Sequence, residues 1–322
     1  MNSLADLLKD SFTDEYVDLV DADLPVGATL AFASQSTEER GRHPVWNAAL
    51  QTRADHCVQL SPDSGGAAHP YELLGAREGH AFAVSLRDDM DILRVLGGTG
   101  TLILDISGLT HQAWASIVRA ILRADVPRAF SVIYVEPARY RSHDTPATLG
   151  SFDLSVRFEG VRPIPGFARL SGRTDSGKRV FIPLLGFEGS RPRLVHAELD
   201  PPTVVPIIGL PGFRIEFPAV AVACNQEYLD ESRSYTRLRT ARGACPFDAF
   251  RVIDQIVKDE SADHIQLAPL GTKPHALGAF LYSLLGGKNS EIVYDHPVRR
   301  PNRTEGIGMT HVYRVSDFVG AM

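Results

Sequence analysis

Apolar runs of strand length alternate along the chain with segments whose apolar residues recur at helical spacing. The clearest example begins at His264 with H-I-Q-L-A-P-L, which has the length of a strand and stops at Gly271. From there to Leu285 the apolar positions fall on one face of a helix: Ala276, Leu277, Phe280, Leu281 and Leu284. The pattern predicts a buried strand that passes through a short turn into an amphipathic helix.

The first half of the chain repeats this alternation. We expect strands at residues 29–34, 57–60, 81–86, 101–106 and 129–135, and helices at 45–52, 88–96 and 112–123. Strands that are apolar on both faces and alternate with helices indicate a parallel sheet covered on both sides.

The alternation weakens over residues 139–178, where Gly, Pro, Ser and Arg accumulate, and then restarts. The second half predicts strands at 179–185, 203–208, 264–270, 291–294 and 311–315, and helices at 192–199, 220–231, 247–258 and 273–285. We therefore predict an α/β protein with two Rossmann-like, mostly parallel sheets and helices on both faces. The expected domains are 1–150 and 179–322, joined by a connector at 151–178; one long sheet is the alternative.

Composition narrows the class of protein. The chain has 44% hydrophobic and 22% charged residues and a net charge of −6, which argues against broad binding to nucleic acid. Cys57, Cys224 and Cys245 lack metal-ligand spacing, so we expect no zinc site and a reducing compartment. No apolar stretch approaches the roughly 20 residues that cross a bilayer, and the amino terminus is too acidic for a secretory signal. These features favour a cytoplasmic protein with no membrane partner, and none of them indicates a particular cofactor.

The turn G-T-K-P-H is the strongest candidate for binding an anion. Thr272 is a plausible N-cap, and Pro274 suits a first helical turn because its missing N–H would have no partner there. Free backbone N–H groups, the helix dipole and the ammonium group of Lys273 would then face one point, which favours phosphate. Gly-Thr-Lys is not a P-loop, and an ordinary capped helix with a solvated lysine is the alternative.

Two more turns follow strands in the second half and offer ligand contacts. Ligands bind at the carboxyl ends of parallel strands, so we expect these turns to share one site with the first. The candidate ligand-binding residues are Gly186, Glu188, Arg191, Gly209, Gly271, Thr272, Lys273, His275 and Arg303. The alternatives are that the glycines serve only the turns, that Glu188 pairs with Arg191 at the surface, and that Arg303 lies in a solvated basic loop.

Carboxylates also follow strands in the first half, and they define a second candidate site. Asp105, Glu38 and Glu136 would be the catalytic residues of an enzyme that uses acid–base or metal-assisted chemistry. Asp105 would serve equally as the cap of the following helix. The chain has no Gly-x-Ser-x-Gly, His-Glu-x-x-His or Gly-x-Gly-x-x-Gly motif in the required context, so the standard serine hydrolases, zincins and dinucleotide dehydrogenases are excluded.

The segment L-A-P-L-G-T-K-P-H-A-L-G resembles the CRISPR-associated Rossmann fold, or CARF, superfamily. In that superfamily a strand leads through a Gly-Thr-Lys turn into a helix, and the turn helps to bind a cyclic oligonucleotide. The resemblance covers the second half and implies ligand contacts for Gly271, Thr272 and Lys273. The chain departs from the family in placing this half second, in its Pro274-His275 pair, and in lacking an Arg-x-x-x-x-His ribonuclease motif.

Three functions follow from these patterns. The first is a cytoplasmic protein that binds a phosphate-bearing, nucleotide-like small molecule; the resemblance implies a sensor or effector component of a prokaryotic antiviral defence system. The second is a nucleotide hydrolase or transferase that uses the carboxylates of the first half. The third is a scaffold subunit of a larger complex. The sequence leaves open whether the protein catalyses a reaction. It also leaves open whether the protein binds a partner protein or forms a homo-oligomer.

Overall fold

The structure is a computed structural model, and its described residues are 11–17, 25, 27–42, 54–97, 100–125, 128–141, 152, 154–169, 177–287 and 289–322. The chain divides into two compact units. Unit 1 comprises Met1–Arg139 and Thr304–Met322, and unit 2 comprises Tyr140–Arg303. Both units are α/β, as the alternation of strands and helices predicts. The predicted helix at 45–52 lies outside the described residues.

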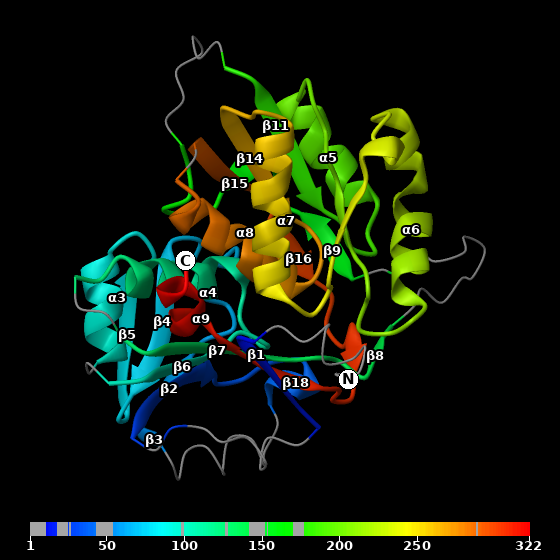
Figure 1. Ribbon diagram of the computed structural model, residues 1–322. Helices are drawn as coiled ribbons and strands as arrows, with labels where there is room; N and C mark the ends of the chain where they lie inside the picture. Colours follow the sequence, from blue (N-terminus) through cyan, green and yellow to red (C-terminus); the bar gives the residue numbers. More distant parts are fainter. Residues whose placement is uncertain are drawn as a thin grey trace, which may run out of the picture. The chain divides into compact units, whose positions relative to one another are not determined.

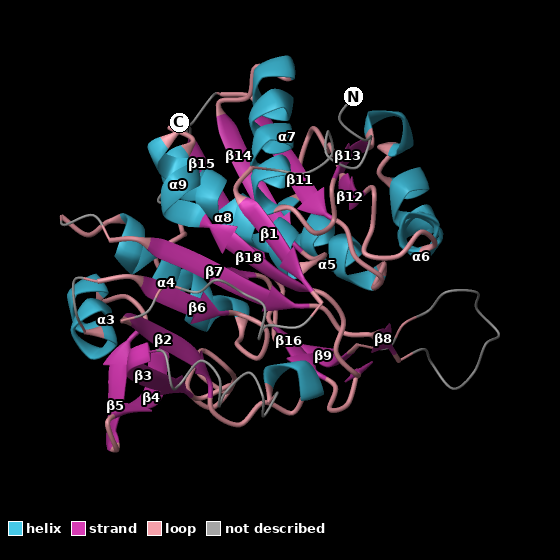
Figure 2. Ribbon diagram, turned by 60° about the horizontal axis from the view of Figure 1, so that its bottom comes forward, coloured by secondary structure: helices cyan, strands magenta, loops and turns pink. Residues whose placement is uncertain are grey.

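Unit 1 is built on a sheet that has eight strands among the described residues, in the order β1-β18-β7-β6-β2-β3-β4-β5. Their bounds are β1 (Thr13–Tyr16), β18 (Thr310–Arg314), β7 (Phe130–Val135), β6 (Leu102–Asp105), β2 (Ala28–Ala33), β3 (Ala54–Leu60), β4 (Glu72–Arg77) and β5 (His80–Ser85). The central strands β7, β6, β2 and β3 are mutually parallel, and each strand outside them pairs antiparallel with its neighbour nearer the centre (Figure 2). The sheet is therefore mixed.

Short polar side chains cap the two longer helices of unit 1 among the described residues. Thr110 caps α4 (His111–Leu122) by accepting the amide of Ala113, and Asp88 caps α3 (Asp89–Leu96) in the same way. Nearly every side chain of α4 is buried. The short helices η2 (Glu39–Gly41) and α9 (Val315–Gly320) complete this unit.

The main sheet of unit 2 has the order β10-β15-β14-β11-β12-β13. The bounds are β10 (Arg162–Pro163), β15 (Asn289–Tyr294), β14 (His264–Pro269), β11 (Arg179–Leu184), β12 (Ile207–Gly209) and β13 (Arg239–Ala241). All are parallel except β10. Strands β9 (Ser155–Phe158) and β16 (Pro297–Arg299) form a separate ribbon, and the strands β8 (Arg139–Tyr140) and β17 (Thr304–Glu305) lie where the chain passes between the units.

The helices of unit 2 are α5 (Ser190–Leu199), α6 (Phe217–Glu231), α7 (Pro246–Asp259) and α8 (Lys273–Leu285), with the short helix η3 (Tyr235–Arg237) before β13. The strand order reverses between β11 and β14, so right-handed crossovers place α5 and α6 on one face and α7 and α8 on the other. Figure 1 shows α7 and α8 together in front of β11 and β14. Gly278 permits their close approach, because a Cβ at this position would lie 2.3 Å from the carbonyl oxygen of Pro246.

The division of the chain differs from the expected one. The strand predicted at 311–315 is β18, which pairs with β7 and so belongs to unit 1. Residues 140–178, expected to end the first domain and to form a connector, belong to unit 2 and supply β9 and β10. The prediction failed because nothing local in the sequence shows that the end of the chain returns to the first sheet.

Candidate functional site

The turns that follow β11 and β14 lie side by side at the carboxyl edge of the unit 2 sheet. The two strands are parallel neighbours, with Leu184 opposite Pro269. A Cβ on Gly186 would lie 2.7 Å from the carbonyl oxygen of Leu270, and a Cβ on Gly271 would lie 2.6 Å from that of Leu185. The sequence placed these turns together correctly. Their glycines are required because the two backbones touch at the point where the strand order reverses.

The start of α8 has the predicted cap. The Thr272 hydroxyl accepts the amide of His275 at 3.2 Å and donates to the carbonyl oxygen of Gly243 at 2.8 Å. This second bond ties the turn after β14 to the turn after β13. Lys273 is only 5% exposed, so the alternative of a solvated lysine is wrong. A buried ammonium group beside a helix N-terminus concentrates positive potential at this edge.

Arg191 belongs to this edge, but its guanidinium is held by an internal partner. It donates to the two carboxylate oxygens of Asp295 at 2.8 and 2.7 Å and to the carbonyl oxygen of Leu270 at 3.1 Å. Burial lowers the pKa of Arg191, but the charge and hydrogen bonds of Asp295 outweigh burial and raise it overall. Arg191, which was predicted to contact the ligand, is therefore a fixed positive charge beside the turns after β11 and β14.

Glu188 is likewise bound within unit 2. Its carboxylate accepts the amide of Leu154 at 3.2 Å and the hydroxyl of Ser155 at 3.0 Å, and it lies 3.8 Å from the guanidinium of Arg191. The expected pairing with Arg191 is present, but both side chains are at most 10% exposed, so it is not a surface pair. Glu188 thus fastens the β9–β16 ribbon to the turn after β11.

His275 lies beneath the turns and does not face solvent. It is 0% exposed, and its Nε2 bonds to the carbonyl oxygen of Arg242 at 3.1 Å. Burial lowers its pKa to about 4, although the carbonyl groups of Arg242 and Ala241 oppose this. Gly209 is also a packing position, because a Cβ there would lie 3.0 Å from the Cα of Gly243. His275 therefore shapes the site from inside, which corrects its expected role as a direct ligand contact, whereas Gly209 is partly exposed and its ligand contact stays a prediction.

Arg303 is the last residue of unit 2 and follows strand β16 in the chain. Its carbonyl oxygen accepts the amide of Arg141 at 2.9 Å. On the ribbon itself Arg299 lies opposite Ser155, the residue that binds Glu188. Burial raises the pKa of Tyr294, and the positive charges of Arg191 and Arg299 oppose that shift. Arg299 therefore places positive charge near Tyr294 at the end of β15.

Sequence reasoning missed Asp295, Ser155 and Gly243. Asp295 follows β15, so the rule that functional residues follow parallel strands applies to it, but it was not among the candidates. Gly243 follows the parallel strand β13, so the same rule reaches it once that short strand is recognised, whereas Ser155 carries no such signal. Their roles arise from contacts between segments that are far apart in the chain.

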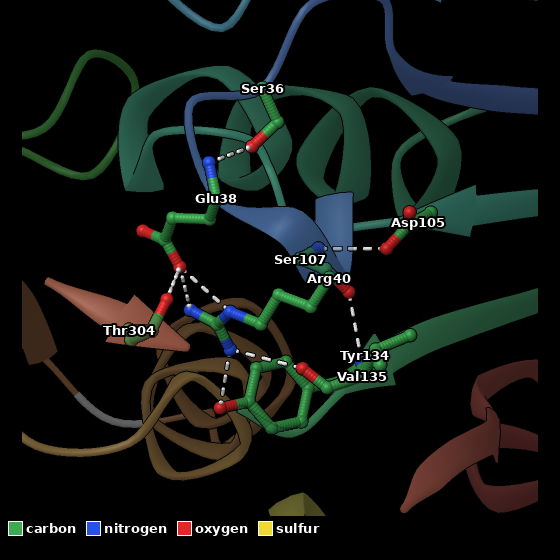
Figure 3. Close-up of polar contacts among 8 residues, drawn as sticks. All are labelled: Ser36, Glu38, Arg40, Asp105, Ser107, Tyr134, Val135 and Thr304. Atoms are coloured by element: carbon green, nitrogen blue, oxygen red, sulfur yellow. Dashed lines mark hydrogen bonds and ion pairs between the residues drawn. The ribbon is translucent and has the colours of Figure 1, made fainter. Parts of the chain in front are cut away.

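The candidate carboxylates of unit 1 also lie at the ends of parallel strands, but each has a partner within the unit; Figure 3 shows the partners of Glu38 and Asp105. Glu38 is 5% exposed, lies 2.6 Å from the Arg40 guanidinium and accepts the hydroxyl of Thr304. Arg40 also donates to the Tyr134 hydroxyl and to the carbonyl oxygen of Val135. This network packs the turn after β2 against the ends of β7 and β17.

Asp105 organises the turn after β6. Its carboxylate accepts the amide of Ser107 at 2.8 Å, and the hydroxyl of Ser107 accepts the amide of Val135 (Figure 3). The expectation that Asp105 caps the following helix is wrong, since Thr110 is the cap. Asp105 instead fixes the turn that leads to it.

Glu136 binds His311, whose Nε2 lies 2.9 Å from the Glu136 carboxylate and whose Nδ1 lies 3.4 Å from Glu15. His311 is 2% exposed. Burial lowers its pKa, but the hydrogen bonds to the two glutamates outweigh burial and raise it above 6.5. Glu136 thus has a partner that links β7, β18 and β1.

The described residues contain no group of three or more His, Cys, Asp or Glu side chains arranged to hold a metal ion. Within the same ranges every helix is too short or too polar to cross a bilayer. The three candidate carboxylates of unit 1 lie at one sheet edge, yet each makes bonds that stabilise the unit.

No family model matches the chain, and no curated protein matches it. Among solved structures it is similar to a universal stress protein from Pseudomonas aeruginosa UCBPP-PA14, at 11% identity and a TM-score of 0.27, over 84% of this chain and 94% of that one. A likeness at this score carries no argument about fold or function. The resemblance of the Gly-Thr-Lys turn to the CARF superfamily stays a prediction.

Proposed function

We propose that unit 2 binds a phosphate-bearing, nucleotide-like ligand at the carboxyl edge of its sheet, where the turns after β11 and β14 meet. The observation that carries the proposal is the reversal of strand order between these two strands, since open parallel sheets bind ligands at that position. The capped N-terminus of α8 and the buried Lys273 supply positive potential there.

The internal ion pairs refine this proposal. Arg191 and Glu188 do not bind the ligand directly; they hold the two turns and the β9–β16 ribbon in place. We assign the contacts with phosphate to the backbone of Gly271 and Thr272 and to the side chain of Lys273. Such a preformed electropositive turn needs little rearrangement to bind an anion.

Equilibrium titration with nucleotides and cyclic oligonucleotides tests the proposal. The Lys273→Met variant keeps the length of the buried side chain and loses its charge, so we expect the affinity to fall about tenfold or more, the size of one charge-assisted hydrogen bond. Lys258→Met is the matched control, because Lys258 is exposed and pairs only with Asp254 among the described contacts. Equal binding by wild type and Lys273→Met contradicts the assignment.

The enzyme alternative makes a different prediction. If nucleotides are turned over, and turnover is lost in Asp105→Ala but kept in Lys273→Met, the functional site lies in unit 1. The bonds made by Glu38, Asp105 and Glu136 argue against that outcome.

The sensing role rests on the resemblance of the Gly-Thr-Lys turn alone. In that role ligand binding to unit 2 shifts a population of states that unit 1 reports, as part of prokaryotic antiviral defence. Tight binding of a cyclic oligonucleotide without turnover supports this role, and preference for mononucleotides with turnover contradicts it.

A further inference from the structure

Four aromatic side chains of unit 2 meet in one cluster: Tyr140, Phe152, Phe187 and Phe217. The rings of Phe152 and Phe187 are stacked with centroids 4.7 Å apart, and Phe217 and Tyr140 meet Phe187 edge-on at 5.2 and 5.5 Å. Phe187 is therefore the centre of this aromatic cluster.

The cluster lies at the edge of the sheet that carries the proposed phosphate site. Phe187 stands between Gly186 and Glu188 in the turn after β11, and the backbone of this turn touches the turn after β14. Phe217 begins α6, which follows β12. The same turn thus supplies a contact to the Gly271–Lys273 segment and the central ring of the cluster.

The four residues of the cluster are less buried than the aromatic residues of the hydrophobic core. Phe181, Phe247 and Phe280 of the same unit are 0% exposed, whereas each residue of the cluster keeps part of its surface in solvent. The neighbouring loop after β12 exposes Leu210 and Ile215 as well, at 49% and 97%. Exposed apolar surface is unfavourable by about 25 cal/mol for each Å², so a planar ligand that covers these rings gains binding energy.

We propose that the aromatic cluster is a stacking surface for the base of the nucleotide whose phosphate lies at the Gly271–Lys273 turn. This inference rests on the proposed function and extends it, because it requires the ligand to carry a nucleobase. Stacking on an aromatic ring is available to every base, so the cluster gives affinity without selecting one base.

The test compares ligands that share a phosphate but differ in the base. Ribose 5-phosphate, AMP, GMP, CMP and UMP are titrated separately into the full chain, with calorimetry as the readout. We expect at least one nucleoside monophosphate to bind about tenfold or more tighter than ribose 5-phosphate. We expect Phe187→Ala to remove that difference and to leave the affinity for ribose 5-phosphate unchanged.

Two further variants keep the test decisive if Phe187→Ala unfolds. Phe187→Trp retains a stacking surface and should keep the preference for the nucleoside monophosphate, whereas Phe217→Ala removes a ring at the rim and should weaken it. Tyr235→Ala is the control, since Tyr235 is 51% exposed and lies outside the cluster. An equal effect of Tyr235→Ala contradicts the inference.

The outcomes separate this inference from the proposed function. If ribose 5-phosphate and the nucleoside monophosphates bind equally and Lys273→Met weakens both, the stacking surface is wrong and the phosphate site stands. If none of the five ligands binds, the stacking surface is contradicted, and the phosphate site is then decided by the titration with cyclic oligonucleotides.

Discussion

Asp295 binds Arg191 through two parallel hydrogen bonds, from Nε to Oδ2 at 2.8 Å and from Nη2 to Oδ1 at 2.7 Å. Asp295 is 0% exposed and Arg191 is 7% exposed. The pair joins the end of β15 to the first turn of α5, and the same guanidinium reaches the carbonyl oxygen of Leu270. The charge pair therefore holds three strand ends of unit 2 in register beneath the candidate site.

Removing one member of this pair should destabilise unit 2 strongly. Asp295→Asn removes the carboxylate that accepts both close hydrogen bonds from the buried Arg191 and leaves the more distant Glu188, at 3.8 Å, as its charged partner, so we expect the free energy of unfolding to fall by about 3–5 kcal/mol in urea denaturation. The double variant Arg191→Met, Asp295→Asn should recover part of this loss, because the buried guanidinium is removed together with its main partner and Glu188 keeps its hydrogen bonds to Leu154 and Ser155. A loss that is equal or greater in the double variant would show that the two side chains act independently.

The contact between the turns after β11 and β14 predicts a steric effect. Gly271→Ala places a Cβ 2.6 Å from the carbonyl oxygen of Leu185, a backbone atom that cannot move without shifting β11. We expect a loss of about 1–3 kcal/mol in unfolding free energy, as for other overpacked sites. Gly320→Ala is the control: no atom lies within 4 Å of a Cβ there, so its effect should stay within about 0.5 kcal/mol.

His311 predicts a stability that decreases as the pH rises. Burial alone lowers its pKa, but Glu136 and Glu15 outweigh it, so the folded pKa lies above 6.5. The charged imidazole is stabilised in the folded state, and its contribution is full below pH 6.5 and is lost as the pH rises through the folded pKa. Unfolding free energies of wild type and His311→Gln, measured across this range, should converge with rising pH. A difference that grows with pH contradicts the assignment.

His275 predicts the opposite slope in acid. Its folded pKa of about 4 lies below the ordinary 6.5, so between these values the unfolded chain binds a proton that the folded chain does not. Stability should therefore fall as the pH drops through this window, by about 3 kcal/mol in total. His275→Gln keeps a donor for the carbonyl oxygen of Arg242 and should flatten the acid limb of the stability curve. Parallel curves for wild type and variant would show that His275 is not the group responsible.

Much of the fold was predictable because local patterns determine it. The strand after His264 and the cap at Thr272 each lie within one short segment, and the structure confirms both; the prediction of one apolar face on α8 is wrong, because every residue from Lys273 to Tyr282 is buried. Strand β13 and the ribbon of β9 and β16 were missed, since strands of three or four residues in Arg- and Pro-rich sequence carry little periodicity.

For the candidate site, the sequence predicted which turns meet but not which partners their side chains bind. The rule for parallel strands brought the turns at Gly186 and Gly271 together correctly, because it depends on topology alone. It did not show that Arg191 and Glu188 bind internal partners, since those partners, Asp295 and Ser155, are brought near by tertiary packing. Ion pairs between distant segments leave no mark on local sequence.

The most direct test of the central claim is to map where nucleotide binds on the folded chain by amide chemical shifts. On titration with the nucleoside monophosphate that binds best, the account predicts large shifts for the amides of Gly186, Gly271 and Thr272 and no comparable change at Gly41 or Gly108 in the turns of unit 1. Shifts confined to Gly41 and Gly108, with Gly186 and Gly271 unchanged at saturation, would contradict it.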